Sequence, residues 1–180
     1  MIPIRCGATC RPCNPSGSRM NKMLKLVLLI LVALPVLIFL AGQAGLLRGT
    51  RPTDIGVKQH QLKAPGATSE NVVSSQAAMH PHTAYHLIAP LKLHGEAAAE
   101  FARLQKIVSA MPRAQIITSA PDYFHAEFET KMLKFVDDVE FMLDADKGEI
   151  QMRSASRIGR KDFGVNRARL EQVRAAFEAK

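Results

Sequence analysis

Reactive polar side chains are densest in two stretches of the C-terminal half of the chain. Asp137, Asp138 and Glu140 lie close together, and Arg153 and Arg157 follow a short turn sequence. Carboxylates beside guanidinium groups can form ion pairs, bind a charged ligand or exchange protons with a substrate. With a serine-rich segment upstream, the candidate binding residues are Asp137, Asp138, Glu140, Arg153, Ser154, Ser156, Arg157, Asp162, Asn166, Arg167, Ser74, Ser75 and Gln76.

A β-hairpin is predicted for residues 134–156, because apolar and polar residues alternate on both sides of a turn sequence. With Leu143 opposite Ile150, the matching of apolar faces places Glu140 opposite Arg153 on the outer face. The outer acids then meet the outer arginines. The simplest interpretation of this outer set is a ladder of cross-strand ion pairs, each of which stabilises the sheet only slightly.

Asp137 is a harder case, because the same register turns it inward, opposite Ser156. An ionised carboxylate among apolar side chains needs a partner or several hydrogen bonds. The expected partner is Arg157 or Arg167. Two alternatives remain open at this point: a buried structural pair, or a polar pocket that uses the same groups to bind a ligand.

Two other constellations have suggestive residue types. His80, His82 and His86 have metal-like spacing, but no carboxylate or Cys lies near them in the sequence. Ser74 with His86 and Asp137 would supply the residue types of a hydrolytic triad, but a Gly-x-Ser-x-Gly elbow is missing. No glycine-rich phosphate loop is present either, so we expect no metal and no cofactor.

Three cysteines, Cys6, Cys10 and Cys13, are spaced like the thiolates that hold an iron–sulfur cluster in radical enzymes. A short tail lacks the large barrel that such enzymes build around the cluster, and a fourth ligand for zinc is missing. Met20 and Met23 are alternative start sites that would remove these cysteines. The remaining chain has no Cys and must fold without a disulfide.

Residues 23–47 form an apolar stretch, and no polar side chain occurs between residues 26 and 41. About 20 residues of helix cover the hydrocarbon core of a bilayer, so a transmembrane helix is predicted. It would follow a basic tail of residues 1–22. Residues 1–19 are absent if translation starts at Met20. The alternative is a cleaved signal peptide, with Gly42-Gln43-Ala44 as its cleavage site.

The charge distribution bears on both location and partners. The formal charge is +8, but seven of the 24 Lys and Arg flank the apolar stretch, leaving 17 against 16 acids in the rest. A nearly neutral domain argues against nucleic-acid binding. Five positive residues precede Leu26 and two closely follow Leu47, which predicts a cytoplasmic N-terminus and a periplasmic C-terminal domain at a bacterial inner membrane.

The rest of the chain is predicted to be a linker over residues 48–82 and an exported domain over residues 83–180. We expect folded structure to begin near Tyr85. The predicted strands are residues 83–89, 114–118, 122–129 and the two arms of the hairpin, and the predicted helices are residues 95–111 and 166–178. This order indicates an α+β fold, a small antiparallel sheet of about five strands with two helices on one face.

Four motifs in order along the chain are Val73-Ser74-Ser75-Gln76, Phe135-Val136-Asp137-Asp138-Val139-Glu140-Phe141, Arg153-Ser154-Ala155-Ser156-Arg157-Ile158-Gly159 and Asp162-Phe163-Gly164-Val165-Asn166-Arg167. With them, residues 55–178 resemble the domain of unknown function 1499 family. The resemblance implies a bacterial or plastid-related α+β module, in some members preceded by a membrane helix, and it implies no particular activity.

One departure from the family pattern concerns cysteine. The family usually has Asn-Cys-Val-Ser-Ser where this chain has Asn71-Val72-Val73-Ser74-Ser75, and a second family Cys upstream is also missing. If those two cysteines form a disulfide in other members, this chain has lost both halves. The departure argues against thiol chemistry as the shared function.

These observations predict a membrane-anchored periplasmic binding or interaction module with a polar Asp/Ser/Arg cluster. Its expected partners are the lipid bilayer, through residues 23–47, and either a small ligand or a protein of the envelope. The alternative is an enzyme in which Asp137 or Asp138 acts as acid or base. No motif in the sequence specifies a reaction, which favours binding over catalysis.

Overall fold

The computed structural model describes residues 21–179. Cys6, Cys10, Cys13 and the alternative start site Met20 lie outside the described residues. Two compact units are present, one ending at Val36 and the other formed by residues 37–180. The second unit, called the domain below, holds all the strands and the other helices.

Helix α1 (Lys22–Gln43) covers most of the predicted transmembrane stretch. Among residues 21–179 it is the one helix that is long and apolar enough to cross a membrane. Its large apolar side chains are exposed, and Pro35 lies within it. A membrane span and an N-terminal signal sequence share these features, so α1 is a candidate for either.

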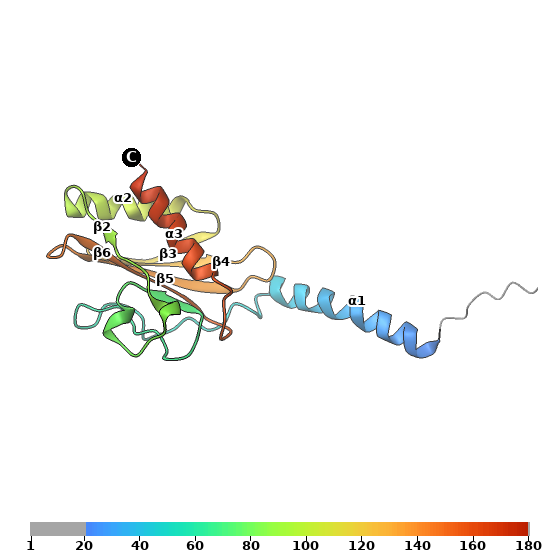
Figure 1. The fold of residues 1–180 in the computed structure, drawn as a ribbon. Coiled ribbons are helices and arrows are strands. Elements are labelled where there is room, and N and C mark those ends of the chain that lie inside the picture. The colour runs from blue at the N-terminus through green and yellow to red at the C-terminus, as the bar shows by residue number, and fades with distance from the viewer. Residues whose placement is uncertain (1–20, 180) are drawn as a thin grey trace, which may run out of the picture. The chain divides into compact units, whose positions relative to one another are not determined.

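The domain is built on one antiparallel sheet (Figure 1). Its strand order is β1-β6-β5-β4-β3, and the short β2 also pairs with β6. The strands are β1 (Val72–Ser74), β2 (Leu91–Lys92), β3 (Ala114–Ser119), β4 (Tyr123–Glu129), β5 (Val136–Asp144) and β6 (Glu149–Ser156). The predicted α+β class, with an antiparallel sheet and two helices, is confirmed; the sheet has six strands instead of about five.

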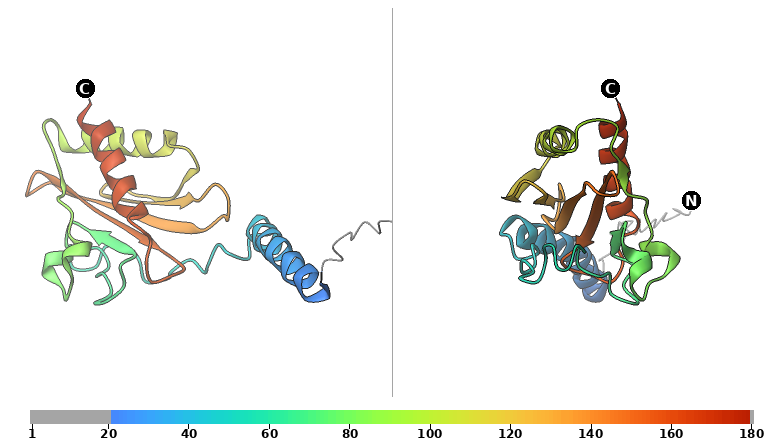
Figure 2. Two further views of the ribbon diagram at one scale, coloured as in Figure 1. Left: turned by 45° about the vertical axis from the view of Figure 1, so that its right-hand side comes forward. Right: turned by 90° about the vertical axis from the view of Figure 1, so that its left-hand side faces the viewer.

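Helices α2 (Ala97–Ala110) and α3 (Val165–Glu178) cover one face of the sheet, the inner face (Figures 1 and 2). Each has a stripe of buried residues at helical spacing, as predicted. Glu96 caps α2 by accepting hydrogen bonds from the first backbone amides, and Pro112 follows its end. Apolar residues of β4, β5 and β6 meet these stripes, and Phe124 and Phe141 stack with ring centroids 4.7 Å apart.

The opposite, outer face of the sheet is covered by residues 48–63, which we call the strap (Figure 2). The Gly56 amide donates to Glu140 at 2.8 Å, and the Leu62 amide donates to Gln76 at 2.7 Å, with Leu62 only 2% exposed. The prediction that folded structure begins near Tyr85 is therefore wrong. The strap shows no regular spacing of apolar residues in its sequence, because hydrogen bonds from its backbone to polar side chains of the domain hold it in place.

The predicted strand at residues 83–89 is also wrong. Residues Ala84–His86 form a short 3₁₀ helix, and the strand β2 begins only after Pro90. The His86 ring causes the difference, since its Nδ1 accepts the Thr83 amide hydrogen at 2.9 Å and its Nε2 lies 2.9 Å from the Ser69 carbonyl oxygen. A local turn held by this buried ring replaces the ladder hydrogen bonds of a strand.

Candidate functional site

The predicted register of the β5–β6 hairpin is confirmed. Leu143 pairs with Ile150 and Glu140 with Arg153, while Asp137 pairs with Ser156. Alternation along these strands then divides the candidate residues between the two faces of the sheet. They form two separate clusters, and each has a different relation to solvent.

The outer cluster centres on the Arg157 guanidinium group. Arg157 donates to both oxygens of Asp138, at 2.7 and 2.8 Å, and also bonds Glu127. The other contacts come from His125, whose Nε2 lies 2.8 Å from Asp138, and from Arg51 of the strap, which donates to Glu127 at 2.6 Å. The side chains of Arg157, Asp138 and His125 are at most 5% exposed.

Glu140 forms the second half of the outer cluster. It accepts hydrogen bonds from Arg153 at 2.7 Å, from the Tyr123 hydroxyl at 3.0 Å and from the Gly56 amide of the strap. Burial, followed by the charge of Glu140, raises the pKa of Tyr123 far above its usual value, so the phenol remains a donor at neutral pH. The predicted ion pairs between outer acids and outer arginines are present, as Glu140–Arg153 and Asp138–Arg157. They are buried, so the small contribution that we predicted, which applies to exposed pairs, does not describe them.

The pKa values within this cluster agree with permanent charges. Burial alone would raise the pKa of Asp138, but the hydrogen bonds from Arg157 and His125 outweigh it and lower that pKa. Glu127 behaves in the same way, since Arg51 and Arg157 lower its pKa against the effect of burial. Burial would lower the pKa of Arg157, and its two carboxylate partners raise it instead.

The upstream candidates Ser74, Ser75 and Gln76 join the strap to the sheet. The Ser75 hydroxyl donates to Gln151 at 2.7 Å and accepts the Met152 amide at 2.9 Å. The Gln76 side chain bonds backbone groups of the strap, and Ser74 accepts the Gln76 amide hydrogen. In the structure Ser75 bonds this segment to β6, and Gln76 bonds it to the strap.

The inner cluster centres on Asp137, which is 3% exposed. Its partner is Arg169 of α3, whose Nη2 donates to Asp137 Oδ2 at 2.6 Å. The predictions of Arg157 and Arg167 as partners are both wrong. Arg157 turns to the outer face, and Arg167 donates to two backbone carbonyl oxygens, those of Tyr85 and Leu87.

Arg169 is held in place by a chain of hydrogen-bonded polar side chains. Asn166 accepts hydrogen bonds from Arg169, at 2.8 Å, and from the Ser154 hydroxyl, at 2.5 Å. Its amide group donates to Ser156 at 2.9 Å and to the Asn71 carbonyl oxygen at 3.0 Å. Asn166 is fully buried, and this chain connects α3, β6 and the residue before β1.

Asp162 fixes the start of α3. Its carboxylate accepts the backbone amides of Gly164 and Asn166, both at 2.9 Å, and bonds the Tyr85 hydroxyl. Burial would raise the pKa of Asp162, but the hydrogen bonds from Tyr85 and these amides lower it. Burial and the bond to Asp162 raise the pKa of Tyr85 to about 12.

One pocket reaches the inner cluster and has a volume of about 290 Å³. Three predicted site residues, Asp137, Ser156 and Asp162, contribute to its wall. The rest of the wall is mainly apolar: Phe135, Val136, Ile158, Phe163 and Val165, with Thr130, Gly159 and Lys161 completing it. An apolar pocket with a few convergent polar groups is the usual form of a small-ligand site.

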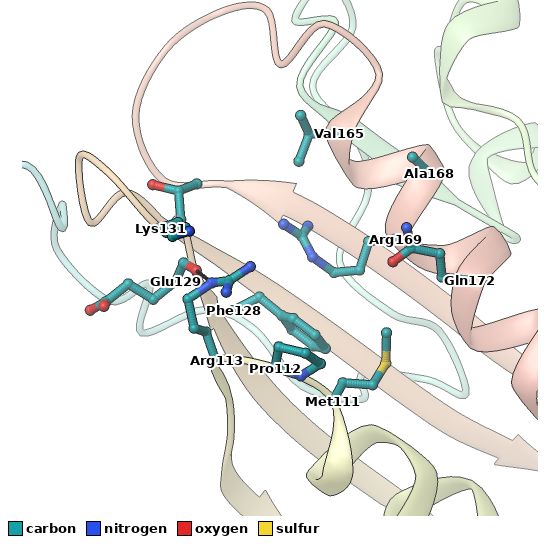
Figure 3. Close-up of a pocket in the computed structure, with 11 residues that line it drawn as sticks. Met111, Pro112, Arg113, Phe128, Glu129, Lys131, Val165, Ala168, Arg169 and Gln172 are labelled. Carbon is teal, nitrogen blue, oxygen red and sulfur yellow. Dashed lines mark hydrogen bonds between the residues drawn. The ribbon is translucent and has the colours of Figure 1, made fainter.

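A second pocket, of about 360 Å³, lies on the other side of the Asp137–Arg169 pair (Figure 3). Figure 3 shows Arg169 reaching from α3 over the ring of Phe128, with its guanidinium carbon 5.0 Å from the ring centroid. Arg113 and Lys131 also contribute to this pocket. The two pockets share Thr130 and Val165, so each reaches one partner of the buried ion pair.

Sequence reasoning missed two important groups. Arg169 carries a detectable signal, because it lies three residues after Asn166 on the stripe that α3 buries. His125 and Glu127 are the polar members of a strand that alternates polar and apolar residues, a pattern that ordinarily places them in solvent, but both are buried. No local signal marks them as buried, because the strap that covers them is distant in sequence.

The remaining constellations do not come together in space. Ser74 lies on the outer face and Asp137 on the inner face, while His86 bonds Ser69, so no triad is formed by these residues. His82 bonds the His80 carbonyl oxygen at 2.7 Å. Within residues 21–179, no group of three His, Cys, Asp or Glu side chains is placed to hold a metal ion.

Comparison with known protein families supports the assignment suggested by the motifs. A family model described as protein of unknown function (DUF1499) matches residues 62–177. The chain belongs to the DUF1499 family. The DUF1499 match includes the inner cluster and the sheet residues of the outer cluster, but not Arg51 and Gly56 of the strap. No curated protein and no solved structure shows a significant match to the chain.

Proposed function

We propose that this DUF1499 protein is a membrane-anchored binding module whose ligand occupies the pocket beside Asp137. The ligand has an apolar body and one polar group. The apolar wall of the pocket would hold the body, and Ser156 at its inner end offers a hydroxyl group to the polar one. The observation that carries the proposal is this single pocket, in which predicted polar residues meet an apolar wall.

The inner cluster is suited to binding because its polar groups are already held in place. Asp137 is paired with Arg169, and Ser156 accepts a hydrogen bond from the buried Asn166. A ligand therefore meets side chains that need little reordering, which favours affinity. Asp162 is fixed in the same way by the start of α3.

The geometry supports acid or base catalysis less well. Asp138 is 2% exposed and bonded to both His125 and Arg157, and its lowered pKa keeps it ionised. A general base must reach the proton that it removes. Asp137 borders a pocket, but its Oδ2 is occupied by the bond from Arg169. Binding is therefore preferred over catalysis for Asp137, and Asp138 stabilises the fold.

The proposal includes the location of the module. Helix α1 would anchor the protein in a bacterial inner membrane, with the N-terminus in the cytoplasm and the domain in the periplasm. Support comes from the apolar length of α1 and from the five positive residues that precede its apolar run at Leu26, against two that closely follow Leu47. The domain described here contains no Cys, which is compatible with an oxidising compartment.

Native mass spectrometry of the full chain, released from mild detergent, tests the binding proposal. We expect an added mass that disappears on denaturation. In Val165→Trp the new ring would fill the pocket beside Asp137, so the added mass should be lost. Val165 lies at the start of α3 and is 45% exposed, so the fold should tolerate the larger side chain.

The matched control is Ala168→Trp, one turn further along α3. Ala168 contributes to the pocket at Arg169 but not to the pocket beside Asp137. The proposal requires that this variant keep the added mass. Loss in both variants would move the ligand to the pocket at Arg169, and retention in both would exclude the two pockets together.

A further inference from the structure

Four large apolar side chains at one end of the domain are exposed to solvent. Phe163 is 96% exposed, Met132 66%, Val165 45% and Ile158 44%. We call these residues, with the loops that carry them, the tip. Clustered exposed apolar residues are uncommon on soluble domains and usually mark a contact surface.

Strand pairing brings the two loops of the tip together. The loop between β4 and β5 carries Met132, and the loop between β6 and α3 carries Ile158 and Phe163. Because Asp137 at the start of β5 pairs with Ser156 at the end of β6, both loops leave the sheet at the same end (Figure 1). Val165 begins the helix that follows the second loop.

The tip is also where the chain arrives from α1. The last turn of α1 belongs to the same compact unit as the domain, and the Gln43 amide group donates to the Met132 carbonyl oxygen at 2.8 Å. Gly42 is buried against the same loop, and a Cβ atom at this position would lie 2.7 Å from the Leu133 carbonyl oxygen. This close approach places the tip beside the end of the candidate membrane span.

Positive charge accompanies the apolar residues. Lys131 and Arg160 are exposed on the two loops, next in sequence to Met132 and close to Phe163. Phe163 has a backbone φ of 54°, a conformation that bulky residues rarely adopt. Phe163 therefore combines a strained backbone conformation with a ring that is almost fully exposed to solvent.

We propose that the tip inserts into the headgroup region of the bilayer that holds α1. Phe163, Ile158 and Met132 would enter the boundary between headgroups and acyl chains, and Lys131 and Arg160 would meet lipid phosphates. The domain would then be held against the membrane at two places, α1 and the tip. The inference rests on the anchoring part of the proposed function, and Phe163, Ile158 and Val165 of the tip also line the pocket beside Asp137.

The absence of Trp from the chain allows a direct test. In Phe163→Trp the full chain carries one indole, which is placed at the tip. In vesicles of phosphatidylglycerol and phosphatidylcholine with brominated acyl chains, we expect a blue-shifted emission and a loss of fluorescence by contact with bromine. The additional changes Lys131→Glu and Arg160→Glu should reduce that loss, and more so in vesicles with more phosphatidylglycerol.

The control is Ala145→Trp, at the turn that joins β5 and β6 at the opposite end of the same strands. Its emission should remain that of an indole in water, with little quenching. Equal quenching of the two variants would overturn the inference. Resistance of the vesicle-bound protein to a carbonate wash reports the anchoring separately, so a failure of the anchor is distinguished from a failure of the tip.

Discussion

The two faces of the sheet bury charged residues in different ways. On the outer face, Glu127, Asp138 and Glu140 share two arginines beneath the strap. On the inner face, the single pair of Asp137 and Arg169 lies at the edge of the apolar core. Both sets are buried, but only the inner pair borders the two pockets described above.

Buried charge alone therefore does not identify a functional site. The outer cluster contains a His–Asp contact and three acids, residue types that often perform catalysis. It is covered, and each acid is bonded to an arginine. The inner pair has simpler chemistry but is accessible to a small molecule. Access to a pocket therefore separates the outer cluster, which stabilises the fold, from the inner cluster, which is proposed to bind a ligand.

The largest expected effect is on the outer face. Arg157→Met removes the partner of two buried carboxylates, Asp138 and Glu127, and should lower the free energy of unfolding by about 5 kcal/mol, the upper end for breaking a buried ion pair. Urea unfolding of the domain with its strap, followed by circular dichroism, measures this loss. Arg51→Met is the control, since Arg51 bonds the same Glu127 but is 53% exposed, and it should cost about 1 kcal/mol or less. Similar costs for the two variants would contradict the assignment of the outer cluster as a buried network.

The inner pair should give a smaller effect that can be reversed. Asp137→Leu alone leaves Arg169 buried without its carboxylate partner and should cost about 3 kcal/mol. Because an apolar replacement of both partners removes the unpaired charge, Asp137→Leu with Arg169→Met should recover most of this loss. A double-mutant cycle by urea unfolding measures the coupling. Costs that simply add would show that the two residues do not act as a pair.

Local periodicity was sufficient to predict the elements that position the site. The register of β5 and β6 follows from alternation around one turn, and the buried stripes of α2 and α3 follow from spacings of three and four residues. These patterns depend on neighbours in sequence. They place Asp137 opposite Ser156 from the sequence alone.

Long-range contacts account for what local patterns missed. The strap is held by Glu127, Glu140 and Gln76, each far away in sequence, so its own residues carry no periodic signal. The partner of Asp137 was predicted two residues too early on α3, where Arg167 faces the backbone of another segment instead of the sheet. One step along a helix turns a side chain by about 100°, so a small error in spacing changes the face.

The smallest expected effect is on the pH dependence of stability, and it involves carboxylates on both faces. The pKa values of Glu127 and Asp138 are lowered from their ordinary values of 4.5 and 3.8 in the folded state. Because these pKa values are lower in the folded state, the unfolded chain takes up protons first as the pH falls. The free energy of unfolding is therefore fully maintained above the ordinary values and decreases as the pH falls from them towards the lowered folded-state values. Asp138→Asn should therefore be less stable at neutral pH but should lose less stability than the unmodified protein on acidification.

Urea unfolding at a series of pH values from neutral to acidic measures this difference. Asp162→Asn on the inner face should behave in the same direction, because the pKa of Asp162 is also lowered. Asp146→Asn, in the exposed turn between β5 and β6, is the control and should follow the unmodified protein. If Asp138→Asn kept the full acid dependence, Asp138 would not be a source of the stability that acid removes, and Glu127 and Asp162 would have to supply it.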